Sequence, residues 1–234
     1  MSSTPQPSPS KAAAMTTSPL LKVAVVETKA HMRHLIDLLV VGYLPTNPVS
    51  LYLNLEVPEL HKRKSLINRL VLFVAPRSTV YVIDMLDLEV AFSTHGSQGG
   101  RHQTLKSILE SVHVPKAVFD ARKVCAALSR LQDIDKTDEH AAIPSIAMRN
   151  IHDVQLMELA TRESTKSKQY LASWDECILT AGDGSVTSAC ELPTYQPVPL
   201  LFDPRLLQLP VLWANYHAKL TEPGGEMAFW MHMC

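Results

Sequence analysis

The stretch from Val49 to Val57 constrains the fold more than any other part of the chain, because its largely apolar sequence predicts a buried β-strand. Two polar residues, Asn54 and Glu56, lie near its end, and side chains two positions apart on a strand point to the same face. Two carboxylates placed in this way at the edge of an α/β sheet can hold a hard divalent cation, but the first position here is a neutral amide. The strand therefore raises the question of whether this chain is an enzyme at all.

The flanking sequence predicts an α/β domain in which strands alternate with helices. Further apolar runs predict strands at Leu20 to Val26, Ser65 to Ala75, Thr79 to Met85 and Lys116 to Phe119. Apolar residues at helical spacing predict helices over Lys29 to Val41, from Leu105 to Val112, and after Phe119, where Val124, Ala127, Leu128 and Leu131 recur. With 234 residues, 46% of them hydrophobic, the chain is long enough for one core of ordinary size.

The two ends and one internal segment have a different character. Residues 1 to 18 are rich in Ser, Thr, Pro and Ala, which predicts a disordered tail. We expect the folded domain over residues 19 to 222 and a second tail over residues 223 to 234. Glycines and prolines between Lys166 and Pro199 break any long helix in that segment.

The order and spacing of these segments resemble the 3'-5' exonuclease domains of the DEDD type, in the branch near RNase D and the RNA-binding exonuclease-domain proteins. The resemblance covers residues 22 to 220 and is carried by Leu51 to Glu56, Val80 to Asp84 with Leu105 to Leu109, Lys116 to Leu128, and Asn150 to Gln155. It implies an α/β fold of the RNase H-like three-layer type, with a mixed central sheet of about five strands flanked by helices.

The resemblance also implies where catalytic residues should lie. In that family four carboxylates bind two divalent ions, Mg²⁺ or Mn²⁺, which activate a water and stabilise the leaving oxygen of a phosphodiester. The first pair, an Asp-x-Glu on a strand, corresponds to Asn54 and Glu56. The second acidic position falls on Val124. In the third motif Leu201 stands where a tyrosine is expected, and Arg205 stands where an aspartate is expected.

Only Glu56 is retained among these four ligands, so we expect catalytic activity and the divalent cofactor to be lost. Asp120, Asp203 and Asp84 are the candidates for a rearranged ligand set, with Asp120 the first choice to join Glu56 at a metal. Each also has a simpler interpretation. Asp120 fits a helix cap, and Asp203 before Pro204 fits a helix N-cap.

Asp153, before Val154, fits an N-cap beside the sheet in the same way.

Basic residues give the candidate contacts to nucleic acid. The net charge of −1 provides no overall attraction to nucleic acid, so a binding face has to be local. The candidates for this face are Lys62, Arg63, Lys64, Arg101, Lys116 and Arg122. On one face they could hold the phosphates of a single strand, RNA rather than DNA, whereas each taken alone fits an ordinary solvated surface residue.

The remaining reactive residues show no site pattern. The four cysteines (Cys125, Cys177, Cys190 and Cys234) lack zinc-site spacing, and Cys125 is expected to be a buried free thiol. His61, His95, His102, His113 and His152 are expected to be surface or capping residues. No apolar stretch approaches the ~20 residues of a membrane span and the start lacks a signal-peptide pattern, so we expect a cytoplasmic or nuclear protein.

Three functional hypotheses follow from the sequence. The first is an inactive exonuclease-like domain that binds nucleic acid. The second is a working metal-dependent 3'-5' exonuclease with rearranged ligands. The third is a scaffold that binds a protein partner.

Overall fold

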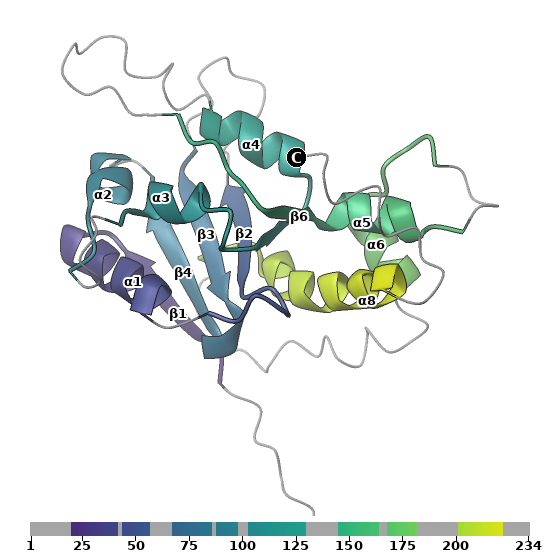
Figure 1. Ribbon diagram of the computed structural model, residues 1–234, viewed down its shortest axis with the longest axis horizontal. Coiled ribbons are helices and arrows are strands. Elements are labelled where there is room, and N and C mark those ends of the chain that lie inside the picture. Colours follow the sequence, from purple (N-terminus) through teal and green to yellow (C-terminus); the bar gives the residue numbers. More distant parts are fainter. Residues whose placement is uncertain are drawn as a thin grey trace, which may run out of the picture.

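The computed structural model describes residues 20–41, 44–56, 67–85, 88–97, 103–129, 145–163, 168–181 and 201–221. These residues form a six-stranded sheet in the order β1-β4-β3-β2-β5-β6 (Figure 1). The strands are β1 (Lys22–Val26), β2 (Leu51–Glu56), β3 (Arg69–Val74), β4 (Thr79–Asp84), β5 (Lys116–Val118) and β6 (Ile151–Asp153). The helices are α1 (Lys29–Val41), α2 (Leu88–Ser93), α3 (Leu105–Leu109), α4 (Ala121–Ser129), α5 (Val154–Thr161), α6 (Trp174–Ala181) and α8 (Leu209–Thr221), with short 3₁₀ helices η1 (Ala75–Arg77) and η3 (Pro204–Gln208).

The strand directions bring five strand ends to one edge of the sheet. β3 is antiparallel to both of its neighbours, β2 and β4, whereas β1 is parallel to β4, β5 to β2, and β6 to β5. The carboxyl ends of β1, β4, β2, β5 and β6 therefore meet at the same edge, together with the start of β3. We call this the carboxyl edge. In open α/β sheets such an edge is where ligands commonly bind.

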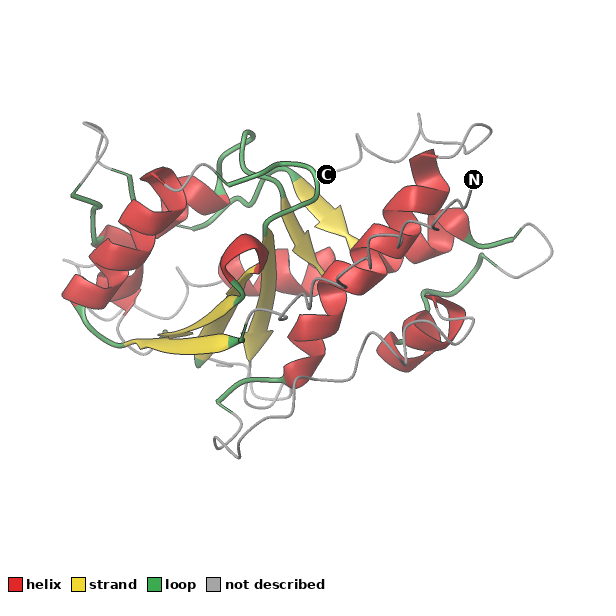
Figure 2. Cartoon of the chain, turned by 90° about the horizontal axis from the view of Figure 1, so that it is seen from below, coloured by secondary structure: helices red, strands yellow, loops and turns green. Residues whose placement is uncertain are grey.

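Helices cover both faces of the sheet, which gives three layers (Figure 2). Side chains of α1, α2, α3 and α4 pack on one face, in a cluster that includes Leu51 and Leu53 of β2. Side chains of α5, α6, η3 and α8 pack on the other face, in a cluster that includes Tyr52. The alternation along β2 thus distributes its side chains between two apolar cores, and this is why the strand is apolar on both faces.

The α/β fold predicted from the sequence is confirmed, with one strand more than the expected five or so. The additional strand is β6, a short edge strand that directly precedes α5. The predicted helix through Val112 is wrong at its end, because α3 stops at Leu109 and Val112 is 52% exposed in the following turn. α6 forms within the segment that was expected to lack a long helix, and it has only eight residues.

The predicted tails, residues 1 to 18 and 223 to 234, lie outside the described residues. Within the described ranges, no helix has the length and apolar character needed to cross a membrane.

Candidate functional site

Glu56 ends β2 at the carboxyl edge, and its carboxylate is already engaged. Asn54 and Glu56 share one face of β2, as the sequence predicted, and alternation from Tyr52 makes this the face covered by η3 and α8. Glu56 Oε1 accepts a hydrogen bond from the backbone N–H of Asp203, 3.0 Å away. Its other oxygen, Oε2, lies 3.6 Å from Nη1 of Arg69, the residue directly opposite on β3. Glu56 therefore links β2, β3 and the segment before η3.

Arg69 stands between two carboxylates in a row across the sheet. In register it lies opposite Glu56 of β2 on one side and opposite Asp84 of β4 on the other. Neighbouring strands are about 4.8 Å apart, so the backbones of Glu56 and Asp84 are separated by roughly two such spacings, with Arg69 between them in the register. Arg69 Nη1 also donates to the backbone oxygen of Leu201, at 3.2 Å. Glu56 and Asp84 are therefore not adjacent in the sheet, and the Arg69 guanidinium is bound on the Glu56 side.

Asp203 is the N-cap of η3, as the sequence predicted, and it forms an ion pair with Arg205. Its Oδ1 accepts the backbone N–H of Arg205 at 3.0 Å, with Pro204 in the first turn. The Arg205 side chain contacts the same carboxylate through Nε, 2.8 Å from Oδ2, and through Nη2, 2.6 Å from Oδ2. Burial favours a higher pKa for Asp203, but the hydrogen bonds and charge of Arg205 outweigh it, so the pKa lies below its ordinary value.

An aromatic pair lies next to Arg205. The rings of Phe119, which follows β5, and Trp174, which begins α6, have centroids 4.5 Å apart. The indole N–H of Trp174 donates to Oε1 of Gln208 in η3, at 2.9 Å. The guanidinium carbon of Arg205 lies over the Trp174 ring, 5.9 Å from its centroid. We refer to Phe119, Trp174, Arg205 and Gln208 as the Trp174 cluster. Sequence analysis missed this cluster, because its members are far apart in the chain and no motif links them.

Asp120 lies at the start of α4 and is enclosed by basic side chains. It is buried, and its carboxylate lies 3.5 Å from Nε of Arg122 and 3.2 Å from Nζ of Lys123. Its Oδ1 is also 3.4 Å from the backbone N–H of Lys123. This arrangement fits the helix-capping role better than a metal ligand. Arg122 and Lys123 themselves are 71% exposed, so both are available at the surface.

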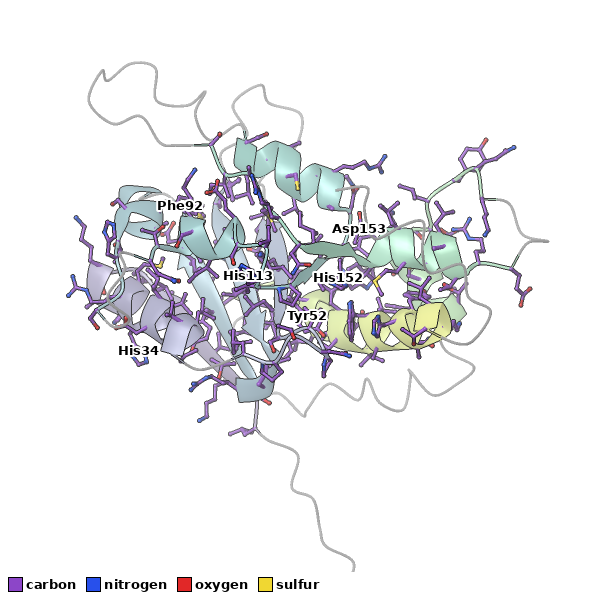
Figure 3. All side chains as sticks on the ribbon, in the orientation of Figure 1. His34, Tyr52, Phe92, His113, His152 and Asp153 are labelled. Atoms are coloured by element: carbon purple, nitrogen blue, oxygen red, sulfur yellow. The ribbon has the colours of Figure 1, made fainter. Side chains whose placement is uncertain are left out.

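Asp153 is a structural carboxylate that joins two helix starts. It is the N-cap of α5, as predicted, with Oδ1 accepting the backbone N–H of Gln155 at 3.0 Å. Its two oxygens also accept the backbone N–H groups of Asp120, at 3.2 Å, and Ala121, at 2.8 Å. Burial raises the pKa of Asp153 above its ordinary value, although these hydrogen bonds oppose the shift. Figure 3 shows Asp153 between α4 and α5.

Val124 and Lys116, which were assigned to the second motif and to the nucleic-acid contacts, are both buried. Val124 is buried in the apolar cluster beneath α4, so this position offers no oxygen to a cation. Lys116 was predicted to contact nucleic acid, and this is wrong, because its side chain is fully buried. Its Nζ donates to the backbone oxygens of Ser111 and Val114, and burial lowers its pKa to about 8. Lys116 therefore anchors the turn before β5 from inside the protein.

The other four basic candidates, Lys62, Arg63, Lys64 and Arg101, lie outside the described residues, as do Cys190, Cys234, His61 and His102. His95 and His113 are exposed, as expected.

His152 and Cys125 differ from expectation. His152 is half-buried and not a surface residue, because its Nδ1 accepts the indole N–H of Trp213 at 3.2 Å. Cys125 is only half-buried, whereas Cys177 is fully buried, and burial raises the pKa of the Cys177 thiol to about 12.

The residues at the carboxyl edge do not fit a divalent metal. Over the described ranges, no three His, Cys, Asp or Glu side chains converge in a way that could hold an ion. Glu56 and Asp203 each contact a guanidinium, and Asn54 brings no charge. Hard divalent ions need several charged oxygens at about 2 to 2.6 Å, whereas each of these two carboxylates already pairs with an arginine.

Comparison with known proteins reveals similarity at the level of structure. RNase D from Trypanosoma brucei, in complex with RNA U12, is similar over 88% of this chain and 64% of that chain, with 15% identity and a TM-score of 0.52. The catalytic core of RRP6 from the same organism is similar over 89% of this chain and 49% of that chain, with 11% identity and a TM-score of 0.51. An EXD2 exonuclease domain is similar over 85% of this chain and 86% of that chain, with 15% identity and a TM-score of 0.42.

Models of protein families and the sequences of curated proteins give no match to this chain. The structural likeness therefore establishes the fold, and the resemblance to exonuclease domains that the sequence order indicated is confirmed at that level. The chain spans about two thirds of the RNase D chain and about half of the RRP6 core.

Proposed function

We propose that this chain, which has the fold of RNase D-like exonuclease domains, binds single-stranded nucleic acid, RNA in the first instance, without hydrolysing it. The observation that carries the proposal is the pairing of Glu56 with Arg69 and of Asp203 with Arg205 at the carboxyl edge. In this proposal the guanidinium groups occupy the carboxylates that the resemblance would assign to metal ions. Under the same proposal the chain uses no divalent cofactor and is located in the cytoplasm or nucleus.

The charge at this edge supports the proposed loss of catalysis. Two-metal hydrolysis depends on carboxylates that hold Mg²⁺ or Mn²⁺ against an activated water and a leaving oxygen. A guanidinium within 2.6 to 3.6 Å of a carboxylate neutralises it and repels a cation that approaches the same oxygens. Val124, buried among apolar side chains, supplies no replacement.

Retention of nucleic-acid binding is supported by the surface near the same edge. Arg122 and Lys123 project from the start of α4 and are largely exposed. Arg205 and the rings of Phe119 and Trp174 add a guanidinium plane and aromatic rings, a combination on which the bases of single strands can stack. The similar RNase D structure is itself a complex with RNA.

Two assays on the purified chain test the proposal. Binding of a labelled single-stranded RNA should be measurable by fluorescence anisotropy, and no nucleotide should be released from that RNA in the presence of manganese. Release that the Glu56→Ala variant abolishes would overturn the claim of inactivity and establish a working exonuclease. An RNA that fails to bind under any condition would overturn the claim of nucleic-acid binding and favour a protein-interaction scaffold.

A further inference from the structure

We infer that the Trp174 cluster recognises an unpaired nucleobase by stacking it on the guanidinium of Arg205, in the absence of any metal. The inference deepens the proposed function and rests on it, because it names what the carboxyl edge binds and how. Among the members of the cluster, only Arg205 stands at a position where the resemblance to exonuclease domains expects a metal-binding carboxylate. Phe119, Trp174 and Gln208 correspond to no expected metal ligand.

The plane of the Arg205 guanidinium is fixed from two directions. Nε and Nη2 contact the carboxylate of Asp203, and the guanidinium carbon lies over the ring of Trp174. A guanidinium held by a carboxylate along one edge and placed over an aromatic ring keeps a defined orientation. The Arg205 guanidinium is thus preorganised to bind a flat group.

The Trp174 ring beneath it is equally well held. Its indole N–H is bound by Gln208, and its ring packs against Phe119 at the end of β5. Val118, the residue before Phe119, is paired with Leu53 of β2, so the support reaches into the central strands of the sheet. Little conformational freedom remains to be lost when a ligand binds, which favours affinity.

Much of the Arg205 side chain is open to a ligand. The Arg205 side chain is 58% exposed although it contacts both Asp203 and Trp174. Unpaired bases in single-stranded RNA stack on aromatic rings and on arginine guanidinium planes. A base placed on the exposed part of Arg205 would lie next to the Trp174 ring.

The charge balance of the edge favours stacking over phosphate binding as the role of Arg205. Asp203 pairs with Arg205 and Glu56 pairs with Arg69, so these four side chains have no net charge. A phosphate gains little electrostatic attraction from a neutral group of side chains, whereas stacking requires a flat, oriented surface and no net charge. Lysine in place of arginine would keep the charge and remove the plane.

The test measures binding of a 5'-fluorescein 12-nucleotide oligoadenylate by anisotropy in EDTA, for the wild-type chain, Arg205→Lys and Arg77→Lys. Arg77 is exposed in η1, at the opposite edge of the sheet, and serves as the matched control. We expect Arg205→Lys to bind about tenfold more weakly, the factor expected from one base stack, and Arg77→Lys to bind as the wild type does. An oligomer of the same length without bases should bind wild type and Arg205→Lys equally.

Each other outcome is informative. Equal binding of oligoadenylate by wild type and Arg205→Lys would overturn the stacking role while leaving the proposed function intact. Binding that appears only after manganese is added would overturn the metal-independent mode and likewise leave nucleic-acid binding intact. Absence of binding with and without manganese would overturn the proposed function and, with it, this inference. An unchanged thermal midpoint of Arg205→Lys shows that weaker binding is not a folding defect.

Discussion

At the scale of single residues, Lys116 shows how a strand can bury a charge. A lysine at the start of a strand is usually solvated, and its position alone gave no sign of burial. The long side chain instead returns to the backbone oxygens of Ser111 and Val114, which satisfy its ammonium group inside the protein. Caps are easier to predict, because Asp153 and Asp203 act on neighbours two residues away, and both were predicted correctly.

Lys116 should make stability depend on pH in the alkaline range. Burial lowers its pKa to about 8 in the folded chain against an ordinary 10.5, so the unfolded chain binds more protons between these values. The contribution of Lys116 to the free energy of unfolding therefore increases as pH rises through this window, by at most about 1.4 kcal/mol per pH unit. Urea unfolding of wild type and Lys116→Met should show a difference that increases from pH 8 to 10.

The comparison with Lys116→Met is needed because the buried Cys177 thiol, with its raised pKa, acts in the opposite direction above pH 9. Lys22→Met, which changes an exposed lysine of β1, should keep the wild-type slope. A difference between wild type and Lys116→Met that stays constant over the window would contradict the assignment.

At the scale of elements, the first residues of α4 and α5 donate backbone hydrogen bonds to the same carboxylate, that of Asp153. Asp153 accepts backbone N–H groups from both helix starts, whereas Asp203 caps η3 alone and is partly exposed. Replacing Asp153 by alanine leaves several buried N–H groups without an acceptor, which should cost about 3 kcal/mol of stability. Asp203→Ala should cost only about 1 kcal/mol, the usual value for a cap. Equal costs, measured by urea unfolding, would show that Asp153 does not tie the two helices together.

A second contact between elements joins β6 to α8 and should respond to acid. His152 Nδ1 accepts the indole N–H of Trp213, whose ring stacks on His217 at 4.4 Å. Burial and the nearby His217 lower the pKa of His152 below its ordinary 6.5. Below pH 6.5 the folded chain then binds fewer protons than the unfolded chain. The stability that this contact contributes is therefore present above pH 6.5 and is lost as pH falls through the pKa of His152 in the folded chain.

The measurement is urea unfolding between pH 7.5 and 5 for wild type, His152→Gln and His113→Gln. Wild type and His113→Gln, which changes an exposed histidine, should lose stability in parallel as pH falls, while His152→Gln loses less. Parallel curves for all three proteins would remove His152 as the source. Sequence analysis took His152 for a surface or capping residue, because its partner Trp213 is 61 residues away in the chain.

At the scale of the whole molecule, the sequence predicted the layers better than the site. Apolar periodicity identified β1 to β5, α1 and α4. A buried face of a strand or helix requires apolar residues at a regular spacing over a few neighbouring positions, so it can be recognised locally. The Trp174 cluster could not be predicted in this way. It assembles only when the carboxyl ends of β2 and β5 meet η3 and the start of α6, and such long-range contacts leave no local pattern.

The same arrangement determines how the folded molecule should respond to divalent ions. A ligand that binds only the folded state raises the free energy of unfolding by RT ln(1 + [L]/Kd), so millimolar manganese would raise the thermal midpoint of any chain with a micromolar site. Glu56 and Asp203 already pair with Arg69 and Arg205, so we expect no such rise. Calorimetric titration with manganese should likewise detect no binding. Micromolar binding that is lost in Glu56→Ala would mean that a metal displaces Arg69 from Glu56, and the edge would then have to be treated as a metal site.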